Sequence, residues 1–174
     1  MTPMSTDTDG STLTLRPASA ADAAAMAALY NPYILDSTIS FETEPIDAAE
    51  MAARLANVEA AGLPWLVAEV DGVLAGYAYA ARWRVRAAYR HAVETSVYLA
   101  AGHGRRGLGT RLYQALLARL RDGGLHTAIG GIALPNAASV ALHEKLGYRR
   151  VALFEEVGFK FGRRIDVGYW QLML

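Results

Sequence analysis

A predicted strand, a glycine-rich loop and a predicted amphipathic helix follow one another in the middle of the chain. The segment "AVETSVYLA" (92–100) alternates in the way of a half-buried strand. The helix is indicated by leucines that recur every four residues, namely Leu108, Leu112, Leu116 and Leu120. The loop between them reads "GHGRRGLGT" (102–110). Because the first N–H groups of a helix lack helical partners, a glycine-rich turn into a helix is typical of an anion site.

The letters "GHGRRG" match the dinucleotide fingerprint G-x-G-x-x-G, but their surroundings do not. That fingerprint needs an acidic residue about twenty positions further on, at the end of the next strand, and here the strand ends in "ALPN" (133–136). The loop also lacks the Lys followed by Ser or Thr that a nucleoside triphosphate loop needs. Its glycines let the main chain wrap a bulky anion, and Arg105 and Arg106 add charge. We therefore expect a pyrophosphate there, and a purely structural turn is the alternative.

Sequence patterns on either side of the loop predict a mixed fold. The predicted elements are a strand at 11–18, helices at 19–30 and 47–62, a hairpin at 64–80, a strand at 91–100, a helix at 108–122, a strand at 126–134, a helix at 136–147 and a hairpin at 148–174. This order, β-α-α-β-β-β-α-β-α-β-β, predicts an α+β fold with a mixed, mostly antiparallel central sheet of about seven strands flanked by helices. It is not the order of a doubly wound parallel sheet.

Composition limits the classes of function. The 17 Lys and Arg residues balance 17 Asp and Glu residues, so no overall field draws the protein to nucleic acid or to an anionic membrane. There is no cysteine, and the four histidines lack metal-ligand spacing, so we expect no metal. The opening residues lack the pattern of a secretory signal, and no apolar run reaches membrane-spanning length, so we expect a cytoplasmic protein. We expect a mobile tail at 1–11 and one domain at 12–174.

Several separated segments resemble one family. The stretch "GRRGLGT" after "VYLAAGH", with "LPNAASVALHEKLGY" beyond it, resembles the GNAT superfamily of N-acetyltransferases, whose loop Q/R-x-x-G-x-G/A holds the pyrophosphate of acetyl-coenzyme A. Gly104 stands at the Q/R position, which departs from that pattern. With "STISFETEP", "WRVRAAYRHAVETSVYL" and "VGFKFGRRIDVGYWQL", the chain from Leu13 to its C-terminus resembles the phosphinothricin and methionine sulfoximine N-acetyltransferase branch.

The resemblance implies acetyl-coenzyme A as co-substrate and a set of residues that contact it. These are Val97, Tyr98, Leu99, Gly104, Arg105, Arg106, Gly107, Leu108, Gly109, Thr110, Asn136 and Ser139. For Asn136, a simple helix cap is the alternative.

The resemblance also makes Glu94 and His143 the catalytic residues. Moving an acetyl group from a thioester to an amine needs an uncharged amine and a proton for the departing thiolate. Glu94 stands in an apolar strand, where desolvation raises the pKa of a carboxyl toward the range of a general base. An ion pair with an arginine such as Arg90 is the alternative. His143 shares a helix face with Asn136 and Ser139, so we expect it to face the coenzyme and to exchange protons near neutral pH, and an ordinary surface histidine is the alternative.

Basic residues crowd the segment "RWRVRAAYR" (82–90), which indicates an anionic partner or a solvated loop. By resemblance, a small amino acid or an analogue such as phosphinothricin or methionine sulfoximine is bound by Phe41, Arg84, Arg86, Tyr89 and Ser96. The resemblance also implies a homodimer with the final strands near the partner's site. The alternatives are an N-acetyltransferase of proteins or peptides, against which the arginines argue, and a non-catalytic module that binds coenzyme A or a nucleotide.

Overall fold

The computed structural model describes residues 5–6, 11–104 and 107–174. Its strands are β1 (Ser5–Thr6), β2 (Thr12–Pro17), β3 (Trp65–Val70), β4 (Val73–Arg82), β5 (Ala92–Leu99), β6 (Thr127–Ala133), β7 (Arg149–Lys160) and β8 (Arg163–Met173). Its helices are α1 (Ala23–Asp36), α2 (Ala48–Ala60), α3 (Leu108–Asp122) and α4 (Ala137–Lys145), with short 3-10 turns η1 (Ala20–Asp22) and η2 (Ala87–Tyr89).

The described strands form one sheet in the order β1-β2-β3-β4-β5-β6-β8-β7. Neighbouring strands run antiparallel except β5 and β6, which are parallel because α3 crosses between them. The expected α+β fold with a mixed, mostly antiparallel sheet is therefore confirmed. The sequence does not predict β1, which pairs with β2 from within the expected N-terminal tail.

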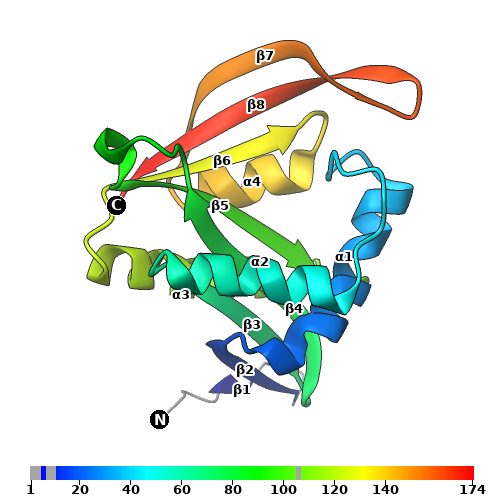
Figure 1. Cartoon of the computed structure of the whole chain (residues 1–174), viewed down its shortest axis with the longest axis vertical. Coiled ribbons are helices and arrows are strands. Elements are labelled where there is room, and N and C mark those ends of the chain that lie inside the picture. Colours follow the sequence, from blue (N-terminus) through cyan, green and yellow to red (C-terminus); the bar gives the residue numbers. More distant parts are fainter. Residues whose placement is uncertain (1–4, 7–10, 105–106) are drawn as a thin grey trace.

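Helices cover both faces of the sheet (Figure 1). The helices α1 and α2 pack on one face, in a core that includes Met26 and Met51. On the other face lies α3, whose predicted leucine stripe is 0–4% exposed and packs against β3, β4 and β5. The apolar residues of α4 pack against this second core. None of the helices in the described part of the chain is long and apolar enough to cross a membrane.

Local signals place most element ends where the sequence predicts them. Asp47 accepts a hydrogen bond from the main-chain N–H of Glu50 at 2.8 Å and so begins α2. The final hairpin turns at Gly162, whose φ of 72° favours glycine. The exception is α1, which the sequence predicts to reach Tyr30 or a little beyond and which continues to Asp36, with Pro32 inside it. A proline removes one helical hydrogen bond, and burial of the helix against the sheet outweighs that loss.

The pairing between β5 and β6 is short. Only three pairs form, from Ala92 with Thr127 to Glu94 with Ile129. Beyond this point β5 continues along β4 to Leu99, whereas β6 continues along β8. The sheet therefore splits directly after Glu94, and the candidate site lies at this split.

Candidate active site

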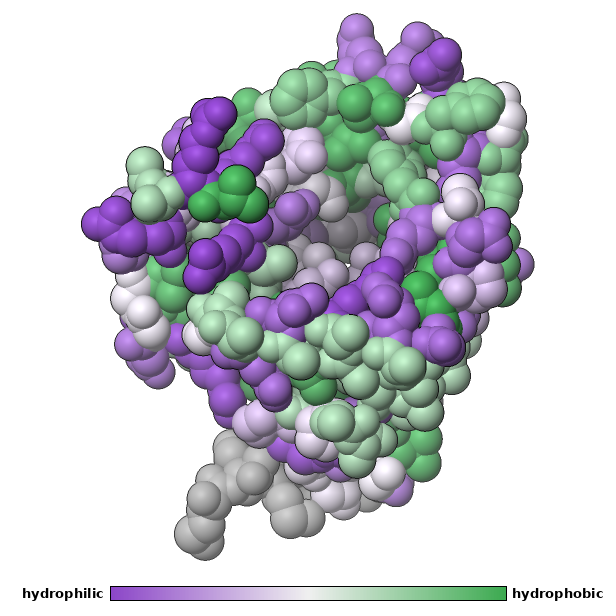
Figure 2. Space-filling view, in the orientation of Figure 1, coloured by the Kyte–Doolittle hydropathy of each residue, from purple (hydrophilic) through white to green (hydrophobic). Residues whose placement is uncertain are grey.

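Two cavities open at the split between β5 and β6. The loop cavity, of about 870 Å³, is lined by the glycine loop, the first turn of α3, α4 with its N-cap, the end of β5, and one side of α1 with residues 37 and 39 after it. The hairpin cavity, of about 740 Å³, is lined by β5, β6, α1, the β7–β8 hairpin and the segment 39–42. Ile39 lines both cavities, and the consecutive residues Val97 and Tyr98 line one each, so the cavities adjoin along β5. Figure 2 shows the molecule hollowed between the hairpin and the helices below it.

The glycine loop forms one end of the loop cavity. Its lining residues are Gly102, Gly104, Gly107, Gly109 and Thr110, and the expected residues Arg105 and Arg106 lie outside the described part of the chain. Gly107 begins α3 with a φ of 73°, and an added Cβ there would meet no atom within 4 Å. Gly109 and Thr110 of the first turn of α3 line the cavity, so the N-terminal end of this helix lies at the cavity wall, as an anion site requires.

The main-chain N–H and C=O groups of every second residue of β5 point toward the opening between β5 and β6. Ala100 donates its N–H to Ala75 of β4, so the main-chain groups of Leu99 point the other way. Tyr33 fixes them there, because its hydroxyl donates to the Leu99 carbonyl at 2.6 Å and accepts from the Leu99 N–H at 3.3 Å. Residues two apart on a strand direct their N–H groups to the same side. The N–H of Val97 therefore points into the split.

The first turn of α4 forms another wall of the loop cavity. The side chain of Asn136 accepts a hydrogen bond from the Ser139 N–H at 3.1 Å and so caps the helix. Both residues also line the cavity, so the role as a cap and the position expected for a coenzyme contact occur together.

His143 lies behind Ser139 rather than on the surface of either cavity, and it is only 3% exposed. Its Nδ1 lies 2.8 Å from the carbonyl oxygen of Ser139, which can only accept, so Nδ1 carries the proton. Its Nε2 lies 3.2 Å from the hydroxyl oxygen of Tyr113. Burial lowers the pKa of His143, so the ring is neutral at pH 7. The ring fits there because Gly130 of β6 lies against it, where a Cβ would come within 2.5 Å of Nε2.

A buried polar network that the sequence does not indicate connects His143 to β5. The hydroxyl of Thr95 lies 2.9 Å from that of Tyr148 and 3.1 Å from that of Tyr113. Tyr113 in turn contacts His143, so four polar side chains satisfy one another between the sheet, α3 and α4.

Glu94 lies on the opposite side of β5 and lines the hairpin cavity. Burial raises the pKa of this carboxyl, and the positive charge of Arg84 offsets part of the rise. None of the ion pairs found among the described residues involves Glu94, so the alternative of a pair with Arg90 is not observed. A desolvated carboxylate inside a cavity has the properties of a general base.

A second carboxylate in the hairpin cavity, Glu42, has the opposite environment. Arg54 donates to both of its oxygens, at 2.5 and 3.1 Å, and Tyr30 donates to it at 2.5 Å. The hydrogen bonds from Arg54 lower the pKa of Glu42, and burial raises that of Tyr30 to about 12. Glu42 therefore stays ionised and paired. The sequence gives no sign of this cluster, because its members come from three separate segments.

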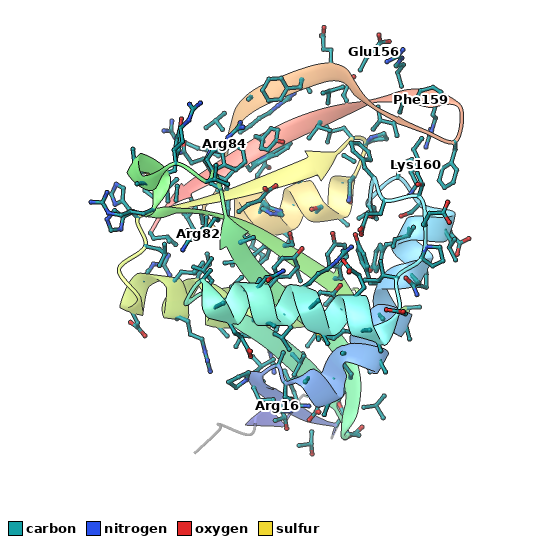
Figure 3. All side chains as sticks on the ribbon, viewed as in Figure 1. Arg16, Arg82, Arg84, Glu156, Phe159 and Lys160 are labelled. Atoms are coloured by element: carbon teal, nitrogen blue, oxygen red, sulfur yellow. The ribbon has the colours of Figure 1, made fainter. Side chains whose placement is uncertain are left out.

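The residues expected to bind the substrate are distributed unevenly. Phe41 lines the hairpin cavity, whereas Arg84, Arg86 and Tyr89 are exposed between β4 and β5, and Ser96 pairs with a residue of β4. Arg84 is the nearest of these three to the cavity in electrostatic terms, because its charge acts on both Glu94 and Tyr169 (Figure 3). Tyr169 is a lining residue of the cavity.

Two residues expected to contact the coenzyme take other positions. Tyr98 lines the hairpin cavity, because its side chain alternates to the Glu94 side of β5. Leu108 is 4% exposed in the α3 core and contributes no side chain to the loop cavity. Within the described residues, no group of three or more His, Cys, Asp or Glu side chains is placed to hold a metal ion.

Comparisons with known proteins identify the family. The acetyltransferase (GNAT) domain family matches residues 15–168. The phosphinothricin N-acetyltransferase of Streptomyces viridochromogenes is 45% identical over 90% of this chain and 85% of its own. The L-methionine sulfoximine/L-methionine sulfone acetyltransferase of Salmonella typhimurium is 37% identical over 93% of this chain and 95% of its own. A phosphinothricin acetyltransferase of Sinorhizobium meliloti, solved in complex with acetyl-coenzyme A, superposes with a TM-score of 0.90 at 36% identity, over 93% of this chain and 88% of its own.

A family match over most of the chain, together with relatives of this identity and coverage, establishes the family. The chain belongs to the GNAT acetyltransferases and is an acetyltransferase.

We predict that Gly107→Val weakens the binding of acetyl-coenzyme A roughly tenfold, or about 1.4 kcal/mol, because the new side chain projects into the loop cavity. Gly62→Val is the matched control. Gly62 has a similar φ of 70°, also meets nothing within 4 Å, and lines neither cavity. Isothermal titration of both variants separates obstruction from backbone strain. Equal losses in the two variants would contradict the assignment of the cavity.

Proposed function

We propose that the protein transfers the acetyl group of acetyl-coenzyme A to the amine of a small amino acid or a close analogue. The coenzyme occupies the loop cavity, with its pyrophosphate at the glycine loop, and the acceptor occupies the hairpin cavity. The observation that carries this proposal is the position of Glu94, a desolvated carboxylate in the hairpin cavity at the point where β5 and β6 separate.

The proposed reaction is direct attack in a ternary complex. The acceptor nitrogen forms a bond to the thioester carbon, the carbon–sulfur bond breaks, and coenzyme A leaves as the thiolate. Glu94 takes the proton from the amine, either directly or through a water molecule. The N–H of Val97, which points into the split, polarises the thioester carbonyl.

We propose that His143 assists the proton transfers without itself giving up a proton, because the neutral ring carries one proton, on Nδ1, and its loss would leave an imidazolate. Both ring nitrogens are already engaged, and the ring lies off the cavity surface. Ser139 connects it to the cavity, because its Oγ is 3.4 Å from Nδ1 and the residue lines the loop cavity. We therefore propose that His143 acts through this hydroxyl.

The acceptor class rests on charge and on the relatives. Arg84 and Arg86 supply positive charge beside the hairpin cavity, which suits the carboxylate and phosphinate-like groups of an amino acid analogue. Relatives at 37–45% identity are named for phosphinothricin and for methionine sulfoximine or sulfone. An enzyme for basic protein tails would need an acidic groove, and a binding module would need no desolvated base, so both alternatives fit less well.

We also propose a homodimer that works in the cytoplasm. The outermost strand β7 and the turn after it carry apolar side chains that are 40–64% exposed, namely Val151, Leu153, Phe154, Val157, Phe159 and Phe161. A second copy packed on the final hairpin would cover them. Sedimentation equilibrium that finds a monomer at micromolar concentration would remove this proposal.

Release of coenzyme A in the presence of different amines tests the function itself. We expect turnover with phosphinothricin, methionine sulfoximine or methionine sulfone, and little with aminoglycosides or basic peptides. Release at the background rate with every amine would refute the enzymatic proposal, and preference for a basic peptide would favour a protein acetyltransferase.

Proton transfer gives a second prediction. Glu94→Gln should lower kcat by roughly a hundredfold or more with acetyl-coenzyme A binding unchanged, because a general base acts in the transition state. In the wild type, activity should rise as pH increases through the raised pKa of Glu94, since the base must be ionised, and the variant should lose this limb. His143→Phe should also lower kcat and change the pH profile. Unchanged pH profiles in both variants would assign the two residues to structure.

The third prediction concerns the acceptor. Arg84→Ala should raise the KM for the amino acid roughly tenfold to a hundredfold and leave the KM for acetyl-coenzyme A unchanged, because one charge-assisted contact is lost. Arg84→Lys should restore only part of the affinity. Arg82→Ala is the control, since Arg82 lies in the same segment (Figure 3), but it is the charge of Arg84 that acts on Glu94 and Tyr169. A rise in the KM of the coenzyme instead would place Arg84 at the coenzyme phosphates.

A further inference from the structure

Lys160 is buried at the end of β7, with 4% of its surface exposed. Its Nζ donates to three main-chain carbonyls, those of Ile34 at 2.6 Å, Ser37 at 2.8 Å and Ser40 at 2.7 Å. An ammonium group has three N–H donors, so these contacts use all of them. Figure 3 shows Lys160 on the hairpin beside the loop that follows α1. The side chain thus joins two segments that lie about 120 residues apart.

The three carbonyls belong to the end of α1 and to the loop that follows it. Ile34 lies in the last turn of the helix, and Ser37 is its C-cap. The last carbonyls of a helix lack helical partners and carry partial negative charge, so a cation is well placed there. Ser40 lies farther along the loop, and its contact therefore fixes how the chain leaves the helix.

The loop held in this way is a wall of the hairpin cavity. Four consecutive residues, Ile39 to Glu42, line that cavity. A second contact lies on the same strand, because Phe41 packs against Gly158, where an added Cβ would come within 2.4 Å of the ring. Residues 158 and 160 point to the same side of β7. The hairpin therefore holds the loop at two points, one apolar and one charged.

We infer that Lys160 is a positioning residue for the acceptor site: its ammonium group holds residues 37–42 against the β7–β8 hairpin and so sets the shape of the cavity that receives the amine. This inference rests on the proposed function for its kinetic consequence, but the contact itself does not. Acetyl-coenzyme A binding depends less on the contact, because Ser37 and Ile39 are the two residues of this segment that line the loop cavity, and the other walls come from α1, β5, the glycine loop, α3 and α4.

The charge of Lys160 can be removed and restored chemically, because the chain contains no cysteine. Lys160→Cys, alkylated with 2-bromoethylamine in urea and refolded, regains an ammonium group at nearly the length of lysine. Alkylation with 2-bromoethanol gives a matched side chain of the same length without the charge. Lys160→Met repeats the neutral case without chemical treatment.

We expect the KM for the amino acid acceptor to rise at least tenfold in Lys160→Met and in the hydroxyethylated protein, and to return to within about threefold of the wild type in the aminoethylated protein. The KM for acetyl-coenzyme A should change less than threefold throughout. Equal recovery with both alkylating agents, or equal rises in both KM values, would overturn the inference, because filling of space or general damage would then explain the loss.

Amide hydrogen exchange tests the contact without reference to activity. Exchange in residues 37–42 should be faster in Lys160→Met than in the wild type, while the amides of α3 are unchanged. Unchanged exchange in 37–42 would overturn the inference even if the kinetics changed. A wild-type protein that acetylates none of the amines would instead refute the proposed function and leave the exchange experiment to decide the role of Lys160.

Discussion

The early end of the parallel pairing between β5 and β6 is the constraint on which the site depends. After Glu94 and Ile129, β5 continues along β4 and β6 continues along β8. The main-chain N–H and C=O groups on the facing edges of β5 and β6, which a continuous sheet would hydrogen-bond to each other, therefore have no strand partner there. Unpaired buried main-chain groups are costly unless something else satisfies them. The Tyr33 hydroxyl does this for Leu99. We propose that the thioester carbonyl does the same for the N–H of Val97, so that the break in the pairing of β5 and β6 is where the thioester binds.

The side chains on the two faces of β5 have different chemical properties at the point where β5 and β6 separate. On one face, Thr95 joins a closed network of hydroxyls and the His143 ring, in which each buried polar group has a partner and the ring is held neutral. On the other face, Glu94 is desolvated with no ion pair among the described residues. A buried network in which every polar group has a hydrogen-bond partner is rigid, whereas a desolvated carboxylate without an ion pair is a stronger base. Strand alternation places these properties one residue apart.

The sequence predicts the parts of the fold that depend on local pattern. The leucine stripe of α3, the Asp47 cap and the Gly162 turn depend on residues within one turn or one hairpin, and the structure has each of them. It predicts less where distant segments meet. The Glu42–Arg54–Tyr30 cluster and the Lys160 contacts join segments with no shared pattern, and the end of α1 depends on tertiary burial that overrides Pro32. The place of His143 depends on Gly130, thirteen residues earlier on another element.

The two cavities also differ in how they are built, and this has a consequence for specificity. The loop cavity is lined by one side of α1, the end of β5, the glycine loop with the first turn of α3, and α4, and the two helix starts among these suit the phosphates of a coenzyme. The hairpin cavity uses side chains from α1, the loop after it, β5, β6 and the final hairpin. The loop of the hairpin cavity is held by the buried ammonium group of Lys160. Desolvation of this charge costs several kcal/mol, and three charge-assisted hydrogen bonds of about 1.5–3 kcal/mol each offset that cost. Changes at residues 40–42 and in the hairpin, which line the hairpin cavity and not the loop cavity, can therefore alter the acceptor without disturbing the donor.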